Sequence, residues 1–201
     1  MTDDFSGMSL IAGSHRFMLI NSSHPIGRQH FTIGHELFHL FIQSNFEAKL
    51  CNGIELGHSD GPEEKRANAF SSYLLLPWDG VLSSIPKNEL GKNKVSLNTV
   101  YGISHYYSAS HTSVLYRLKD MDLIDSNLLD SYSNNVISNA EKRGLSTTLY
   151  KSGNEGLIIG NYGLIAHSLY SENIISKTHY VEIMRDINID VDTLDTGSSD
   201  D

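Results

Sequence analysis

The stretch His35-Glu36-Leu37-Phe38-His39 lies inside a run of residues with helical spacing. Positions four apart on a helix lie on the same face, so His35 and His39 can direct two imidazole nitrogens at one point. Glu36 is rotated about a third of a turn away and can reach a water held there. Two neutral nitrogen ligands, a carboxylate base and an open coordination position are typical of a zinc hydrolase. The motif fixes only three letters, and the chain has ten histidines. The alternative is therefore a half-buried helix with two surface histidines.

A second helix can supply the third protein ligand that a catalytic zinc usually takes. Residues 62–76 begin with Pro62, which suits a first helical turn, and acidic residues favour the positive N-terminal end. Glu64 can provide a carboxylate oxygen. Asn68, one turn further on, can hydrogen-bond a ligating histidine and fix its tautomer. The alternative is that Glu63 and Glu64 are ordinary first-turn acids.

Two blocks of sequence carry a family resemblance. Residues 28–39 read R-Q-H-F-T-I-G-H-E-L-F-H, and residues 64–70 read E-K-R-A-N-A-F, followed by L-L-L-P. These blocks are similar to R-x-x-F-T-x-A-H-E-L-x-H and to E-x-x-A-N-x-F-A…L-L-M-P, so the chain resembles the ImmA/IrrE-type metallopeptidases. The resemblance covers about residues 6–77 and extends more loosely to about 125. Gly34 stands where alanine is usual, and Ser71 and Ser72 replace small apolar residues.

The resemblance implies His35, His39 and Glu64 as zinc ligands and Glu36 as the general base. It also implies an endopeptidase of narrow specificity that cleaves a helix-turn-helix transcriptional repressor and so derepresses mobile-element or stress-response genes. The alternative is a non-cleaving zinc-fold interaction module, such as a toxin–antitoxin or regulatory partner. Glu36 favours the enzyme, because a structural zinc site needs no base and normally has four protein ligands.

The expected chemistry needs one more group. Zinc would lower the pKa of a bound water towards about 7, and Glu36 would take its proton. The oxyanion that forms then needs a donor, and His105 and Tyr106 are favoured because they follow the zinc helices in sequence. The alternative for each is a surface or core-edge residue. Further candidates are His111, Tyr101, Tyr107 and Arg28. The two histidines and the glutamate suit zinc best, although manganese or iron can occupy such a set.

Cys51 is the only cysteine, so the chain forms no intrachain disulfide, and nothing indicates an oxidising compartment. It lies between the two zinc helices in sequence. A thiolate in the fourth zinc position would close the site and keep the enzyme latent. The alternative is a small buried hydrophobe.

Composition limits the partners. The formal net charge is −9, and more than half of it comes from five acids in an acidic tail over residues 189–201, which is expected to be disordered. This balance does not suit broad contact with nucleic-acid phosphates. The N-terminus lacks a signal pattern, and no apolar run approaches the length of a membrane span. A cytoplasmic protein that acts on a protein partner is expected.

The pattern of elements predicts an α+β fold with a small zincin-like core, in which a β-hairpin or short sheet packs on the zinc-binding helices and a mostly helical part follows. The expected domains are a core with a helix-turn-helix-like support over 1–125, a mixed subdomain over 126–188 and the tail. The elements expected in the core are a hairpin over 8–12 and 15–21, helices over 28–43 and 62–76, and a helix-turn-helix over 96–124. Ser96 is expected to cap the first helix of the helix-turn-helix, and Ser108 or Ser110 the second. One helix over 126–143, a second hairpin over 147–160 and helices over 162–171 and 176–187 are expected to follow, the last capped by Ser176.

Overall fold

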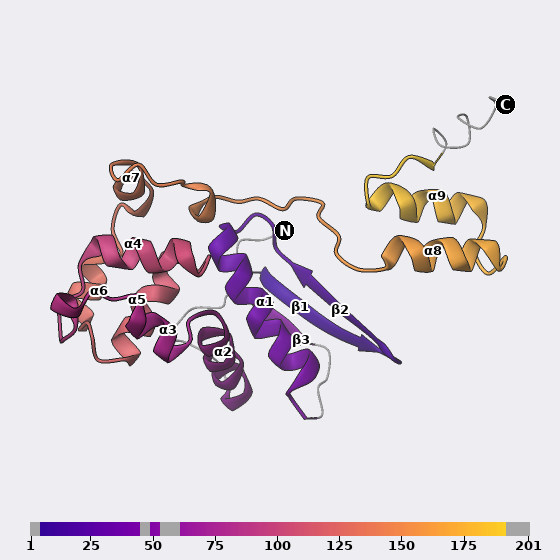
Figure 1. Ribbon diagram of the computed structural model, residues 1–201. Helices are drawn as coiled ribbons and strands as arrows, with labels where there is room; N and C mark the ends of the chain where they lie inside the picture. Colours follow the sequence, from indigo (N-terminus) through magenta and orange to yellow (C-terminus); the bar gives the residue numbers. More distant parts are fainter. Residues whose placement is uncertain (1–4, 45–48, 53–60, 192–201) are drawn as a thin grey trace. The chain divides into compact units, whose positions relative to one another are not determined.

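The computed structural model describes residues 5–44, 49–52 and 61–191. The chain divides into two compact units, Met1–Gly153 and Asn154–Asp201, and each has its own hydrophobic core (Figure 1). Strands are confined to the first unit among these residues, and helices make up most of the remainder. The predicted α+β class is therefore confirmed.

The first unit begins with a three-stranded antiparallel sheet. Strands β1 (Phe5–Ala12) and β2 (His15–Ile20) form the predicted hairpin, and Ala12 pairs with His15. Gly13, in the two-residue turn, has a φ of 61°, which glycine adopts without steric cost. Strand β3 (Lys49–Asn52) pairs with the other edge of β1, so the order is β2-β1-β3.

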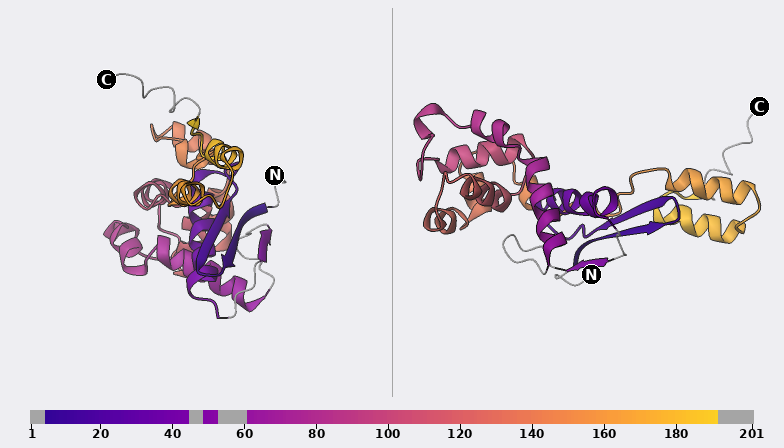
Figure 2. Two further views of the ribbon diagram at one scale, coloured as in Figure 1. Left: turned by 90° about the vertical axis from the view of Figure 1, so that its right-hand side faces the viewer. Right: turned by 90° about the horizontal axis from the view of Figure 1, so that it is seen from below.

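Two helices bearing the sequence motifs pack on this sheet. Helix α1 (Ile26–Phe41) lies along one face of the sheet, and helix α2 (Pro62–Leu75) packs against α1 (Figure 1, Figure 2). Small residues allow the helices to approach closely. Gly34 faces Ser71, whose hydroxyl donates a 2.7 Å hydrogen bond to the carbonyl of Phe31. The spacing between α1 and α2 is thus fixed one residue before His35.

A helical core supports these two helices. It is formed by α3 (Trp78–Ser83), the short 3₁₀ helix η1 (Lys87–Glu89), α4 (Leu97–Tyr106) and α5 (His111–Asp120). Ser96 and Ser110 cap α4 and α5 as predicted, since each hydroxyl accepts a hydrogen bond from a backbone N–H three residues on. The core residues include Leu76, Val81, Val95, Val100, Ile103, Val114, Leu115, Leu118 and Ile124.

The helix-turn-helix-like segment turns one basic side chain inward. Arg117 on α5 is 1% exposed, and its Nε donates a 2.9 Å hydrogen bond to the carbonyl of Leu76 at the end of α2. The start of α5 lies against the start of α1, where a Cβ on Gly27 would be 2.8 Å from Cα of Ser110. The segment therefore braces both metal-site helices, as its expected packing role requires.

The single helix predicted over 126–143 is wrong, because the chain forms α6 (Ser126–Tyr132) and α7 (Val136–Glu141). Asn135 interrupts them with a left-handed φ of 55°, a conformation that asparagine tolerates better than most residues. A tertiary contact holds the break, since the hydroxyl of Tyr101 donates a 2.7 Å hydrogen bond to the carbonyl of Val136. The polar Ser-Asn-Asn stretch of residues 133–135 overrides the apolar spacing.

The hairpin predicted over 147–160 is also wrong. Residues Thr148–Tyr150 form the 3₁₀ helix η2, and the segment then joins the turn before α1. Ser152 makes an isolated bridge with Pro25, and the N–H of Ile26 donates a 2.9 Å hydrogen bond to the carbonyl of Lys151. Pairing with a distant turn thus replaces the local hairpin, and the first unit ends at this attachment.

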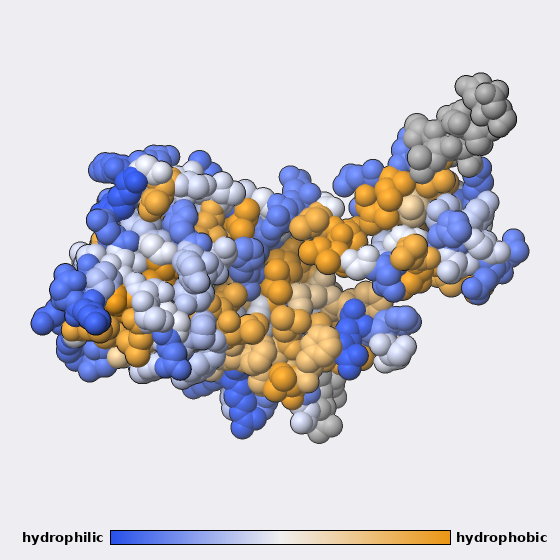
Figure 3. All heavy atoms as spheres, viewed as in Figure 1, coloured by the Kyte–Doolittle hydropathy of each residue, from blue (hydrophilic) through white to orange (hydrophobic). Residues whose placement is uncertain are grey.

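The second unit is a pair of helices, α8 (Tyr162–Ser171) and α9 (Lys177–Asp186), with the predicted Ser176 cap on α9. A small core of Ala166, Tyr180 and Met184 joins them. Many apolar side chains stay exposed, and hydrophobic residues are visible over this unit in Figure 3. Residues 126–153 pack in the first unit rather than with these helices, so the units divide later than the expected boundary after 125. Most of the expected acidic tail, residues 192–201, lies outside the described residues. None of the described helices is long and apolar enough to span a membrane.

Candidate metal centre

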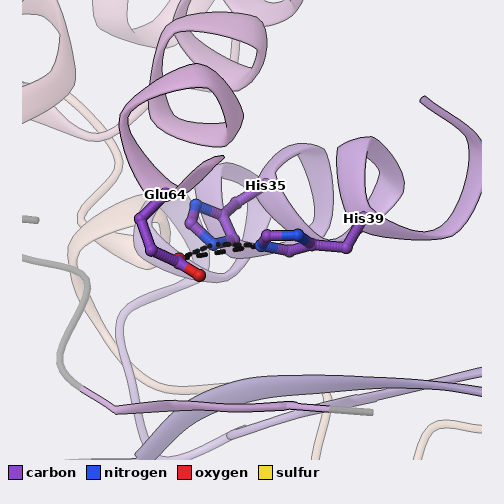
Figure 4. Close-up of side chains that lie close together, drawn as sticks. All are labelled: His35, His39 and Glu64. Carbon is purple, nitrogen blue, oxygen red and sulfur yellow. Dashed lines mark hydrogen bonds and ion pairs between the residues drawn. The ribbon is translucent and has the colours of Figure 1, made fainter. Parts of the chain in front are cut away.

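Helix α1 places two histidines on one buried face. His35 and His39 are 1% and 2% exposed, and their Nε2 atoms lie 3.0 Å apart. Two imidazole nitrogens this close repel each other unless a proton or a cation lies between them. Both rings point towards Glu64, which belongs to the neighbouring helix α2 (Figure 4). The helical i, i+4 spacing therefore produces the convergence expected from the sequence.

Glu64 completes the cluster from the first turn of α2, two residues after Pro62. Its Oε2 lies 3.0 Å from Nε2 of His35 and 3.6 Å from Nε2 of His39. In a tetrahedral zinc site with bonds of about 2.0–2.1 Å, ligand atoms lie about 3.3–3.4 Å apart. The three donor atoms have nearly this spacing, so the three residues can hold a metal ion. Two imidazoles and one carboxylate are a donor set that zinc accepts.

The electrostatics of the cluster favour positive charge beside Glu64. Hydrogen bonds from His35 and His39 hold the pKa of Glu64 well below its ordinary value, so this carboxylate is ionised at neutral pH. Burial lowers the pKa of His39, but hydrogen bonds to Glu64 and Gln43 outweigh burial and raise this pKa overall. A cation is therefore favoured between these side chains.

Two amides orient the histidine rings. Nδ1 of His35 lies 2.8 Å from Oδ1 of Asn68, the contact expected from the sequence. Nδ1 of His39 makes the equivalent hydrogen bond with Oε1 of Gln43. An amide oxygen only accepts, so each Nδ1 donates to its amide, and each Nε2 becomes the ligating atom once a metal replaces its proton. Gln43 was not predicted from the sequence, although it follows His39 by four residues, just past the end of α1.

Glu36 lies beside the cluster on the side of α1 that faces the sheet. It is fully buried, and its Oε2 accepts a 2.7 Å hydrogen bond from the hydroxyl of Ser9 on β1. Ser9 was likewise not predicted from the sequence, since 27 residues separate it from Glu36 and no periodicity links them. Only the packing of α1 on the sheet brings the two together.

The contacts of the expected oxyanion donors lie elsewhere. The ring of His105 is 5.8 Å from the ring of Tyr150, and Tyr106 is 78% exposed and packs edge-on against Tyr107. The further candidates Tyr101 and His111 are buried against each other in the helical core, and Arg28 donates to Ser6. Among the described residues, no hydrogen bond joins His105 or Tyr106 to the metal cluster, so their role stays a prediction.

The role of Cys51 also stays a prediction. Its backbone lies in β3, opposite Gly7 of β1. Its side chain falls outside the described part of the structure.

A family comparison agrees with this geometry. The model of the M78 peptidases, described as the IrrE N-terminal-like domain, matches residues 1–119. The chain belongs to this family. The match to the M78 peptidases supports a metallopeptidase role and ends within α5, so α6 to α9 lie outside it. No curated protein and no solved structure gives a significant match to the chain.

One contact explains two departures of this M78 peptidase from the motif pattern of residues 28–77. A Cβ on Gly34 would lie 2.5 Å from Oγ of Ser71 and 3.1 Å from its Cβ. Glycine on α1 therefore accommodates the serine on α2. The two departures form one packing unit directly beside His35.

Proposed function

We propose that the chain is a zinc-dependent endopeptidase of narrow specificity. The observation that carries the proposal is the convergence of His35 Nε2, His39 Nε2 and Glu64 Oε2 beside the buried carboxylate of Glu36. The described residues supply three protein ligands and leave a fourth coordination position open, which distinguishes catalytic from structural zinc sites. Membership of the M78 peptidases supports the same reaction class.

In this proposal His35, His39 and Glu64 hold the zinc ion. Bound there, zinc supplies Lewis acidity, which acidifies water and polarises a peptide carbonyl. Glu36 accepts the proton of the attacking water and later delivers it to the amine of the leaving peptide. Asn68 and Gln43 keep the two imidazoles in the ligating tautomer throughout.

The proposed substrate is a cytoplasmic helix-turn-helix repressor, whose cleavage derepresses mobile-element or stress-response genes. The resemblance to ImmA/IrrE-type peptidases supports this substrate class. The charge of the chain is compatible with it, because a protein of net charge −9 attracts the basic surface with which a repressor binds DNA.

The full burial of Glu36 favours one other candidate, a non-cleaving partner protein that keeps the metal fold. A carboxylate with no exposed surface meets a substrate only if its surroundings open. Such a module would bind the repressor without hydrolysing it.

A cleavage assay separates the two functions. Candidate helix-turn-helix repressors from the source organism are each incubated with the zinc-loaded wild type and with Glu36→Gln, and fragments are identified by mass spectrometry. Discrete cleavage by the wild type alone is expected. A stable complex with both the wild type and Glu36→Gln, without fragments, would instead establish the binding module. The absence of both cleavage and a complex would refute this substrate.

A matched pair of glutamates tests the metal site itself. Glu64→Gln replaces the anionic carboxylate ligand by a neutral amide, whereas Glu63→Gln changes the adjacent, half-exposed acid, which pairs with Arg66 at 2.8 Å. Zinc affinity is measured by competition with a chromogenic chelator. The expected result is a large loss for Glu64→Gln and wild-type affinity for Glu63→Gln. Equal affinity of both variants would exclude Glu64 as a ligand.

A further inference from the structure

Among the described residues, only one side chain donates a hydrogen bond to the carboxylate of Glu36. Its Oε2 accepts a 2.7 Å hydrogen bond from the hydroxyl of Ser9, which also lies 3.3 Å from the backbone carbonyl of Glu36. Ser9 and Glu36 are both fully buried. The other oxygen, Oε1, is buried and has no hydrogen-bond partner among the described residues. The two oxygens of one carboxylate therefore have different environments.

Strand β1 shapes both environments. Gly7 and Ser9 lie two residues apart, so they occupy the same face of the strand. A Cβ on Gly7 would lie 3.1 Å from Oε1 of Glu36 and 2.6 Å from Cγ2 of Thr32. The strand thus provides a donor for Oε2 and leaves space beside Oε1.

We propose that Ser9 is a positioning residue for the general base: it fixes Oε2 and leaves Oε1 as the atom that accepts and returns the proton. This inference rests on the proposed peptidase function. A hydrogen bond to an ionised carboxylate is short and strong, so it selects one orientation of the side chain. Orientation of a reacting group to within a fraction of an ångström contributes directly to the rate.

The kinetic test uses Ser9→Ala with Ser6→Ala as its control. Ser6 is also fully buried on β1, but its hydroxyl accepts a 3.1 Å hydrogen bond from Nη2 of Arg28. With a helix-turn-helix repressor that the wild type cleaves as substrate, Ser9→Ala is expected to lower kcat about tenfold to a hundredfold. The KM and the zinc content of Ser9→Ala should equal those of the wild type. Ser9→Thr should retain most of the wild-type kcat, and Ser6→Ala should have wild-type kinetics.

A second measurement does not depend on activity. It is a double-mutant cycle measured by urea unfolding of the metal-free proteins: the wild type, Ser9→Ala, Glu36→Ala and the double variant. The cycle gives the coupling free energy between positions 9 and 36. The hydroxyl–carboxylate contact predicts a coupling of about tenfold in the unfolding equilibrium constant.

The two readouts separate the possible failures. Additive effects in the cycle would overturn the proposal, because Ser9 then does not hold Glu36. A measurable coupling with unchanged kcat in Ser9→Ala would also overturn it and leave only a contact that stabilises the fold. If the wild type cleaves nothing, the proposed function fails, and the cycle still decides whether the contact exists.

Discussion

The spacing between the two metal-site helices should depend on one missing methyl group. Alanine in a helix interior is ordinarily more stable than glycine by about 0.5–1 kcal/mol. Gly34→Ala should nevertheless destabilise this protein. The new Cβ would lie 2.5 Å from Oγ, 3.1 Å from Cβ and 3.2 Å from Cα of Ser71, and the last two belong to a rigid part of α2.

The expected magnitude follows from these contacts. Rotating Oγ of Ser71 away breaks its 2.7 Å hydrogen bond to the carbonyl of Phe31, and loss of a buried hydrogen bond costs about 1–3 kcal/mol. Separating the helices instead is overpacking, which costs about 1–3 kcal/mol. After the helix-propensity gain, a net loss of about 1–2 kcal/mol is expected. The movement also takes Glu64 away from His35, so zinc affinity should fall as well.

The assay is urea unfolding, monitored by the fluorescence of Trp78, because Trp78 is the single tryptophan of the sequence and lies in the first unit. Gly102→Ala is the control: this helical glycine on α4 is exposed, and a Cβ there would meet nothing within 4 Å. The control should stabilise by up to about 1 kcal/mol. Gly34→Ala combined with Ser71→Ala should recover about 1 kcal/mol relative to Gly34→Ala alone.

Two results would refute this reasoning. The first is a Gly34→Ala protein at least as stable as the wild type with undiminished zinc affinity. The second is a double variant no more stable than Gly34→Ala, since Oγ of Ser71 would then not be the obstacle.

Three other predictions concern the metal and pH. Asn68→Ala and Gln43→Ala should each lower zinc affinity about tenfold to a hundredfold, as measured by chelator competition, because each frees a ligand ring to turn; unchanged affinity would contradict that role. Zinc at about a hundred times its Kd should stabilise the wild type by about 2.7 kcal/mol in thermal unfolding and should not stabilise His39→Gln. Burial lowers the pKa of His111 in the folded protein. As pH falls below about 6.5, His111 is therefore protonated in the unfolded chain before it is protonated in the folded chain. Stability from this group is present above that pH and lost below it, and His111→Gln should flatten the fall in melting temperature between about pH 7 and pH 5.

Local rules accounted for most of the elements. The hairpin around Gly13 and the caps at Ser96, Ser110 and Ser176 need only short-range geometry, so residue type and spacing predict them. The elements that were predicted wrongly depend on distant partners. Tyr101 holds the break before α7, and the turn before α1 captures Ser152 in place of a hairpin.

The candidate site divides along the same line. Helical spacing brings His35 and His39 together, and the two sequence motifs are enough to indicate Glu64, because a helix fixes the direction of its side chains. The partners that tune the site are decided by packing. Ser9 meets Glu36 because a sheet lies under α1, and Ser71 meets Gly34 because two helices touch. Sequence determined which groups can do the chemistry. Only the tertiary structure decided how each is held, since contacts between separate elements have no period along the chain.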